Sequence, residues 1–272
     1  MENSSFDFGR NWTAFSRHAL TPESVAQAKG DFARLLDGIE LRDRSFLDIG
    51  FGQGLTLLVA TSLGATTVGC DINPLCGNVL EQNRARYFPE VFARRIPVVT
   101  GSILDEKIVE RLRAEAPDRS TRTYDIVHSW GVLHHTGDLQ RAMATAASLV
   151  GANGHLILAI YRRHWSSGGW RLIKRLYNAS PALIQRLMVA ILYPVIYLAK
   201  WLVTRRNPRE QTRGMNFYYN VVDWVGGYPY EYAAAEDVAA SLNAFGFDVV
   251  RVNPAFVPTG CNEFICRRRV NS

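Results

Sequence analysis

A glycine-rich turn near residue 50 has the residue types that let a backbone close around a ligand. Gly50, Gly52 and Gly54 alternate with other residues directly after the apolar run 45–49. A residue without a Cβ lets the chain approach a ligand that a side chain would push away. The spacing differs from the dinucleotide fingerprint Gly-x-Gly-x-x-Gly because Leu55 stands at the sixth position, which weakens a pyrophosphate-binding interpretation.

Two aspartates lie close to this turn in the sequence. Asp48 precedes the turn, and Asp71 ends the next apolar run, 21 residues after Gly50. An acidic side chain in that place can accept hydrogen bonds from both hydroxyls of a ribose. The glycines alone also fit a purely structural strand, turn and helix, but the two aspartates favour a ligand site.

Four further residues could handle a proton. His134 and His135 follow a later apolar run, Tyr161 ends another, and Asp223 lies further along the chain. Imidazole, phenol and carboxylate groups are the usual general acids and bases. The alternatives are that one histidine packs in the core, that the other forms a hydrogen bond at a helix entry, and that Asp223 caps a helix. Adjacent histidines without acidic neighbours make a poor metal site, so we predict no bound metal.

The elements that must position these residues alternate between strand and helix. Strands are predicted at 45–49, 67–71, 96–101, 124–129 and 155–161, and helices at 55–63, 73–86, 103–114 and 138–151. A helix at 236–245 and strands at 247–252 and 262–266 complete the pattern, the last two strands as an antiparallel pair. This order predicts an α/β fold with a Rossmann-like doubly wound sheet, mostly parallel with an antiparallel last strand.

The pattern divides the chain into four parts. We predict an N-terminal lid region at 1–40, a core at 41–161, a basic aromatic insertion at 162–231 and a completion of the core at 232–272. The aromatic segment 11–17 either folds over a bound ligand as a lid or docks on the core.

Composition limits the class of protein. With 272 residues, 47% hydrophobic and 21% charged, the chain can fold around a large core and is not a disordered segment. Its four cysteines form no Cys-x-x-Cys pair, and no signal peptide is visible, so we expect a reducing, cytoplasmic location.

The net charge of +6 is unevenly distributed. The stretch from Arg162 to Arg213 contains eleven Lys or Arg residues and one acid, whereas the rest of the chain has 20 basic and 24 acidic residues and carries −4. A segment of this kind indicates an anionic or apolar partner.

The same segment contains an apolar run. Residues 187–199 carry no charge, and thirteen residues are too few to span a bilayer, which needs about twenty. At helical spacing Arg186, Tyr193, Tyr197 and Lys200 share one stripe, and Pro194 should kink the helix. The pattern fits a cap over an apolar substrate pocket, a helix in peripheral contact with an anionic membrane, or a homodimer interface.

Two stretches resemble a known family. Residues 46–54 and 124–161, the latter containing Ser-Trp-Gly-Val-Leu-His-His-Thr at 129–136, resemble the class I S-adenosylmethionine-dependent methyltransferases. The resemblance covers about 40–161 and 235–267 and is closest to the small-molecule branch that includes quinone-biosynthesis methylases. It implies a seven-stranded sheet with an antiparallel last strand, and S-adenosyl-L-methionine as the cofactor.

The resemblance also assigns roles to residues near the turn. It places Asp48 and Gly50 beside the methionine part of the cofactor, Asp71 on the ribose and Ile72 against the adenine. The predicted cofactor-binding residues are Asp48, Gly50, Gly52, Gly54, Asp71, Ile72, Ser102 and Trp130. Two features depart from the family pattern: Ser102 stands where an acid is common, and Phe51 occupies a position that is usually small. Trp130 could equally pack in the core.

The function that follows is methyl transfer to a small-molecule acceptor by in-line displacement, with a nucleophile about 3 Å from the methyl carbon. His134, His135, Tyr161 and Asp223 are the candidate catalytic residues. Two other functions stay open: a nucleic-acid (tRNA) methyltransferase, suggested by the basic stretch, and a non-catalytic protein that only binds the cofactor. Nucleic acid is the less favoured partner because long aliphatic residues interrupt the basic ones.

Overall fold

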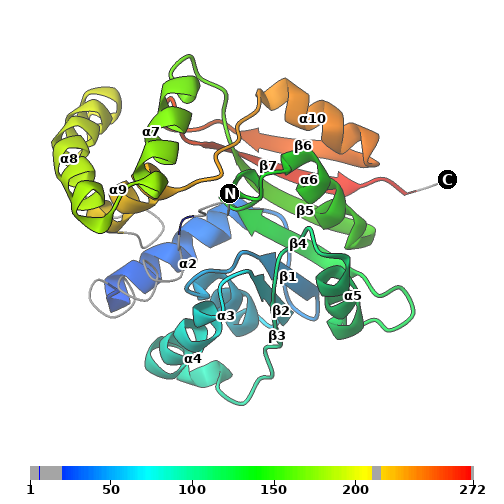
Figure 1. Cartoon of the computed structure of the whole chain (residues 1–272). Helices are drawn as coiled ribbons and strands as arrows, with labels where there is room; N and C mark the ends of the chain where they lie inside the picture. The colour runs from blue at the N-terminus through cyan, green and yellow to red at the C-terminus, as the bar shows by residue number, and fades with distance from the viewer. Residues whose placement is uncertain (1–5, 7–19, 210–215, 271–272) are drawn as a thin grey trace.

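Seven strands form one sheet in the computed structural model, which describes residues 6, 20–209 and 216–270 (Figure 1). The strand order is β3-β2-β1-β4-β5-β7-β6. The strands are β1 (Ser45–Ile49), β2 (Thr66–Asp71), β3 (Val98–Thr100), β4 (Tyr124–Trp130), β5 (Val150–Tyr161), β6 (Phe247–Asn253) and β7 (Cys261–Arg268). The first five pair in parallel, and β7 is antiparallel to both of its neighbours. The predicted doubly wound sheet with an antiparallel last strand is therefore confirmed.

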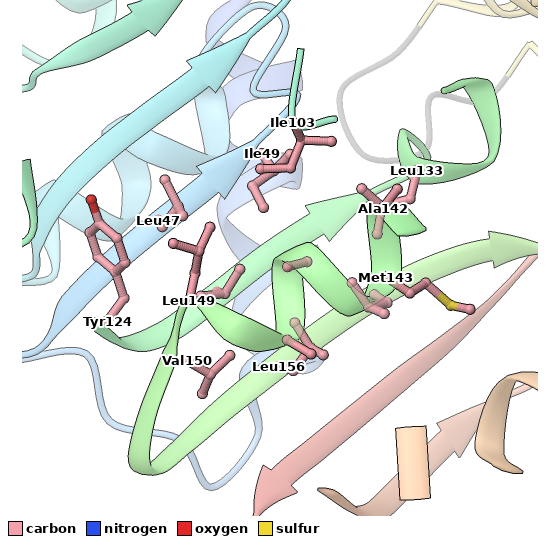
Figure 2. Close-up of a cluster of buried hydrophobic side chains, with 14 of the residues drawn as sticks. Leu47, Ile49, Ile103, Tyr124, Leu133, Ala142, Met143, Leu149, Val150 and Leu156 are labelled. Carbon is pink, nitrogen blue, oxygen red and sulfur yellow. The ribbon is translucent and has the colours of Figure 1, made fainter. Parts of the chain in front are cut away.

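Helices cover both faces of this sheet (Figure 1). They are α2 (Pro22–Leu36), α3 (Leu55–Ser62), α4 (Leu75–Tyr87), α5 (Glu106–Glu115), α6 (Leu139–Ser148) and α10 (Ala235–Ala244), with short 3₁₀ turns at Pro89–Val91 and Leu133–His135. Helices α2, α3 and α4 share one buried apolar cluster with the sheet. Helices α5, α6 and α10 share the other, part of which is drawn in Figure 2.

Strand β1 shows why the sheet needs both layers. All five of its residues are buried, as expected for a central parallel strand covered on each side. Leu47 and Ile49 belong to one apolar cluster, whereas Phe46 belongs to the other, because successive strand residues point to opposite faces. The turn at the end of β1 is thus held by a strand that is packed on both faces.

The segment after β5 forms a helical unit. Helices α7 (Ser167–Ala179), α8 (Ala182–Thr204) and α9 (Phe217–Gly226) pack around a small apolar cluster of their own. A parallel bridge between Arg162 and Ala233 brings the two ends of this insertion together, so the chain leaves the sheet and returns at one place. The residues of the expected N-terminal lid at 11–17 lie outside the described part of the chain.

The expectation that the apolar segment is too short to span a bilayer was wrong, because its helix extends beyond the charge-free run. Helix α8 has 23 residues and takes in Arg186 and Lys200, because charged side chains do not end a helix whose backbone bonds continue. By length and composition alone, it is long and apolar enough to cross a membrane. The predicted stripe is also divided: Tyr193 and Tyr197 pack against Phe217 of α9, whereas Arg186 is exposed.

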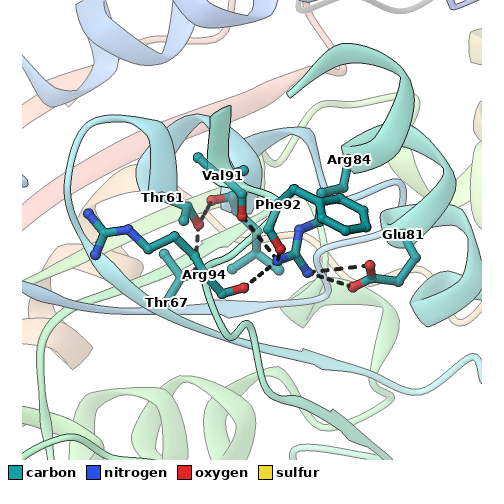
Figure 3. Close-up of polar contacts among 8 residues, drawn as sticks. Thr61, Thr67, Glu81, Arg84, Val91, Phe92 and Arg94 are labelled. Carbon is teal, nitrogen blue, oxygen red and sulfur yellow. Dashed lines mark hydrogen bonds and ion pairs between the residues drawn. The ribbon is translucent and has the colours of Figure 1, made fainter. Parts of the chain in front are cut away.

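A buried arginine fixes the chain between α4 and β3. The guanidinium of Arg84 donates hydrogen bonds to the backbone carbonyls of Val91, Phe92 and Arg94 and pairs with Glu81 (Figure 3). Val91 ends a 3₁₀ turn, Phe92 and Arg94 follow it, and none of the three belongs to a strand. The arginine therefore supplies these carbonyls with the hydrogen-bond donors that a neighbouring strand would supply in a sheet.

Arg84→Ala should lower the free energy of unfolding by roughly 2–4 kcal/mol, because it leaves the buried carbonyl of Val91 and two partly buried ones without their donor. Urea denaturation followed by circular dichroism measures the change. Arg86→Ala, at an exposed position on the same helix, is the control and should change stability by less than about 0.5 kcal/mol. Equal effects of the two substitutions would show that Arg84 does not hold the loop.

Candidate functional site

A cavity joins the glycine turn to the helical insertion. Its volume is about 830 Å³, and its wall includes the carboxyl ends of β1, β2 and β4, residues of α8 and α9, and the loop 257–261. Ligands of open α/β sheets bind outside the carboxyl ends of the strands, where neighbouring connections diverge to opposite faces. The cavity occupies that place in this fold.

The glycine turn forms one end of the cavity. Gly50, Gly52 and Gly54 have φ angles of 75°, 56° and 80°, a backbone conformation that side chains disfavour. A Cβ on Gly50 would lie 2.3 Å from the side chain of Val132, and one on Gly54 would lie 2.3 Å from that of Leu80. Both conformation and space therefore require glycine at these two positions.

Asp71 lies next to the turn at the end of β2. Its two carboxylate oxygens accept hydrogen bonds from the backbone N–H groups of Gly52, at 3.0 Å, and Asn73, at 2.9 Å. Burial raises the pKa of this carboxyl group, and the two backbone hydrogen bonds oppose that rise. Each oxygen retains acceptor capacity for a hydroxyl group of a ligand. The neighbouring Ile72 lines the cavity with 70% of its surface exposed, as a residue that packs on a flat ring would.

A buried histidine that sequence reasoning missed pairs with Asp48. His128 Nδ1 lies 2.7 Å from a carboxylate oxygen of Asp48, and both residues line the cavity. The register places His128 directly beside Asp48 on adjacent strands, 80 residues apart in sequence. Only a correct alignment of the two predicted strands could have revealed the pair.

Two buried polar atoms in this half of the cavity are without a hydrogen-bond partner among the described residues. They are Nε2 of His128 and Oε1 of Gln53, which belongs to the glycine turn. Buried polar atoms are normally satisfied, so unpaired ones that line a cavity fit a ligand with polar groups. S-adenosylmethionine brings an ammonium, a carboxylate, two ribose hydroxyls and an adenine, and the donors and acceptors here suit such a set.

The two remaining predicted cofactor residues also line the cavity. The indole N–H of Trp130 donates to Glu263 at 2.8 Å, which fixes the ring as part of the wall. The hydroxyl of Ser102 accepts a hydrogen bond from the N–H of Leu104 at 3.2 Å. Seven of the eight predicted cofactor-binding residues therefore line one cavity, and Gly54 lies between two lining residues, Gln53 and Leu55, without lining it itself.

The four candidate catalytic residues do not share one position. His135, Tyr161 and Asp223 line the cavity, whereas His134 is fully buried outside its wall. His134 Nδ1 accepts the backbone N–H of Tyr161 at 3.3 Å, and the two rings lie 3.9 Å apart. His134 thus packs against Tyr161 on the side that faces away from the cavity.

His135 presents a neutral imidazole. Its Nδ1 lies 2.6 Å from the carbonyl oxygen of Pro229, so this nitrogen carries the proton and donates it. Burial, aided by the charge of Lys174, lowers the pKa of His135 to about 3. At neutral pH its Nε2 is therefore an unprotonated acceptor, and the group is a weak base.

Lys174 on α7 is a second residue that the sequence did not single out. Its ammonium lies 4.2 Å from the ring centre of Trp224 and 4.8 Å from that of Tyr230, and it donates a hydrogen bond to the carbonyl oxygen of Trp224. Burial lowers the pKa of Lys174 to about 7, and the nearby carboxylate of Asp223 opposes that change. This fully buried lysine therefore joins α7 to the aromatic rings of α9 and of the segment after it.

Comparisons with known proteins agree with this geometry. A family model described as a methyltransferase domain matches residues 23–252. No curated protein sequence matches the chain.

Solved structures resemble the chain at low sequence identity. Magnesium protoporphyrin IX methyltransferase from Synechocystis PCC 6803, with bound SAH, is 15% identical with a TM-score of 0.52, and the match covers 90% of this chain and 83% of that one. An O-methyltransferase family protein from Burkholderia thailandensis is 14% identical with a TM-score of 0.55, over 96% of this chain and 60% of that one. An S-adenosylmethionine-dependent methyltransferase structure from Listeria monocytogenes is 13% identical with a TM-score of 0.51, and the match covers 90% of this chain and 99% of that one. These similarities establish the fold.

Asp71→Ala should weaken the binding of S-adenosylhomocysteine by about 10- to 100-fold, because it removes charge-assisted hydrogen bonds worth roughly 1.5–3 kcal/mol. Isothermal titration calorimetry measures the affinity. Asp118→Ala, which removes an exposed carboxylate that bonds within its own loop, is the control. Unchanged affinity in Asp71→Ala would remove the ribose assignment.

The buried lysine predicts a pH dependence of stability. The pKa of Lys174 falls from 10.5 to about 7 on folding, so between these values the unfolded chain binds more protons at this residue. This lysine therefore makes the free energy of unfolding rise with pH above about 7, by up to ~1.4 kcal/mol per pH unit. Urea denaturation at about pH 7 and pH 9 should show the rise for the wild type relative to Lys174→Met.

The control for this measurement is Lys107→Met, which replaces an exposed lysine. Its free energy of unfolding should equal that of the wild type at both pH values. Parallel stability curves for the wild type and Lys174→Met would contradict the depressed pKa.

Proposed function

The chain belongs to the methyltransferase domain family, whose model matches residues 23–252, and from that premise we propose that its acceptor is a small, largely apolar molecule. The activity itself, methyl transfer from S-adenosylmethionine, follows from the family and from the Rossmann-like fold. The acceptor would lie in the part of the cavity that the insertion encloses.

The cofactor fits the glycine end of the cavity. Gly50 and Gly52 line it without side chains, and Asp71 offers two carboxylate oxygens for the ribose hydroxyls. The Asp48–His128 pair and Gln53 supply polar atoms on the same side. When bound, the cofactor supplies a methyl group already activated on a sulfonium.

The continuity of the cavity with an aromatic wall carries the proposal. From the glycine turn, the cavity extends to a wall of the insertion that includes Trp170, Phe217 and Trp224. A volume of about 830 Å³ lies within the range of small-molecule sites, roughly 300–1,000 Å³. Apolar walls with few polar groups bind apolar ligands.

The charges around the cavity argue against a nucleic-acid acceptor. Among the described residues, Lys200 is the only lysine or arginine that lines it, although the segment 162–209 contains ten such residues. A protein that binds nucleic acid places lysines and arginines along the path of the phosphates into its site. Here the basic residues of the insertion lie mainly outside the cavity.

The residues at the acceptor end can orient a nucleophile and receive its proton. Burial raises the pKa of Tyr161 well above its usual value, so the phenol stays neutral and can donate a hydrogen bond to the acceptor. Asp223 lines the same wall and can accept the proton that an O–H, N–H or S–H acceptor loses as its bond to the methyl carbon forms. His135, with its pKa of about 3, contributes a hydrogen-bond acceptor instead of a strong base. The aromatic wall excludes water from the reacting atoms.

Methyl-labelled S-adenosylmethionine, incubated with the purified chain and a cell extract, tests the acceptor class. We expect the label to appear in small molecules that partition into organic solvent, because an apolar cavity selects such acceptors. Treatment of parallel samples with nuclease and protease distinguishes labelled macromolecules. Label confined to nucleic acid or protein would refute the proposal.

Asp223→Asn should reduce transfer to that product by about 100-fold or more if the carboxylate receives the proton. The affinity for S-adenosylhomocysteine, measured by calorimetry, should stay within about twofold, since such a difference is below 0.5 kcal/mol. Asp237→Asn, at an exposed position on α10, is the matched control. Cofactor binding without turnover of any acceptor by the wild type would instead favour the non-catalytic alternative.

A further inference from the structure

Helix α8 presents an uninterrupted apolar face to the outside of the protein. The exposed residues of this face are Leu183, Ile184, Leu187, Ile191, Val195, Leu198, Trp201 and Leu202. They recur at intervals of three or four, so they lie along one side of the helix. Leu183 is 76% exposed and Ile191 is 59% exposed, values unusual for so many large apolar residues on one element. Figure 1 shows α8 at the outer edge of the molecule, away from the sheet.

The opposite side of α8 is already covered by protein. Val189 is buried in the cluster that the three helices share, and Tyr193 packs edge to face on Phe217 at 5.0 Å. Ile196 and Lys200 line the cavity. A membrane-spanning helix would expose its circumference to lipid or to other spanning elements. Since one side of α8 rests on the soluble domain, the helix fits a position along a membrane surface better than one across it.

The charge of this region indicates which surface the face would meet. Residues 162–209 contain ten lysines and arginines and no aspartate or glutamate. Arg171, Arg175, Arg186, Arg205 and Arg206 are exposed. Basic residues that flank an apolar helix face suit an anionic lipid surface, where each contributes about 1 kcal/mol of attraction.

The same charges disfavour a second copy of the chain as the occupant. In a two-fold symmetric dimer, each subunit would present the same patch to its partner. Such a contact would bring the arginines of α7 and α8 near their own copies, without acids in the segment 162–209 to neutralise them. Like charges at an interface cost free energy, so the patch favours an anionic partner over itself.

Helix α7, in the same insertion, also has exposed apolar residues. Leu172 and Leu176 are exposed one turn apart, next to Arg171 and Arg175. Trp165, just before this helix, is 90% exposed, and tryptophan is enriched at the boundary between water and lipid. Together, the exposed residues of α7 and α8 have the mixture of aliphatic, aromatic and basic side chains that interfacial helices use.

We propose that the exposed face of α7 and α8, centred on Leu187, Ile191, Val195 and Leu198, docks the protein on anionic lipid membranes, with α8 lying in the plane of the surface. The aliphatic residues enter the boundary between headgroups and acyl chains, and the flanking arginines contact the phosphates. This docking does not depend on the identity of the acceptor.

Flotation of the full chain with vesicles tests the docking. Vesicles of phosphatidylcholine mixed with phosphatidylglycerol should bind the protein, binding should fall as salt rises, and vesicles of phosphatidylcholine alone should bind it at least tenfold less, because the arginines lose their partners. The double substitution Leu187→Glu with Leu198→Glu should reduce binding more than tenfold, because two carboxylates would enter the lipid boundary. Glutamate is a good helix former, and neither residue lines the cavity, so cofactor affinity and thermal stability should be retained.

The matched control is Leu63→Glu, which changes an exposed leucine at the end of α3, outside the insertion. It should bind vesicles like the wild type. Arg175→Glu with Arg186→Glu should lose binding to anionic vesicles while remaining folded.

Four results would overturn the proposal. The first two are failure of the wild type to bind anionic vesicles and equal binding by the wild type and the double glutamate variant. The others are resistance of the bound protein to alkaline carbonate, which would show a spanning helix, and a lipid-free dimer in sedimentation velocity that the double variant dissociates.

Discussion

The structure depends on the absence of two side chains at the end of β1. Gly50 faces Val132 from the segment after β4, and Gly54 faces Leu80 of α4, each so closely that a Cβ would collide with its neighbour. The chain can therefore turn from strand to helix tightly, which places the backbone N–H of Gly52 on the carboxylate of Asp71. One steric constraint thus shapes the wall of the cavity and orients the acid beside it, and the packed layers on both faces of β1 keep this turn fixed.

Helix α8 contributes both to the wall of the cavity and to the exposed apolar face. Ile196 and Lys200 lie toward the cavity, whereas Leu187, Ile191 and Leu198 lie outside. A helix buried on both sides would enclose the cavity but have no exposed apolar face. A helix with a single apolar side could not both line the cavity and present apolar residues to the exterior. Because α8 is apolar around most of its circumference, it can close the cavity and still present aliphatic residues to the exterior.

Much of the fold and part of the site could be predicted from local sequence. The apolar runs, the glycine spacing and Asp71 are local signals, and the structure places them as expected. The pairing of His128 with Asp48 depends on strand register, and the burial of Lys174 depends on how α7 docks, so neither has a local signal. His134 and His135 are neighbours in sequence, and only the 3₁₀ turn that contains them decides which one reaches the cavity. The apolar segment was expected to be too short to span a bilayer because only its charge-free residues were counted, whereas the helix continues through Arg186 and Lys200.

The distribution of charge around the cavity matches the chemistry of its ligand. Asp48, Asp71 and Asp223 line the wall together with a single lysine, Lys200, so the described wall is rich in carboxylates although the chain as a whole is basic. A sulfonium is a cation, and neighbouring carboxylates favour it over neutral or anionic ligands. Burial keeps Tyr161 and His135 neutral, and the proposed role of Asp223 is to receive a proton there without placing a second positive charge near the sulfonium. Methyl transfer converts that cation to a neutral thioether, so a carboxylate that takes up the acceptor's proton as the positive charge disappears keeps the charge of the cavity balanced.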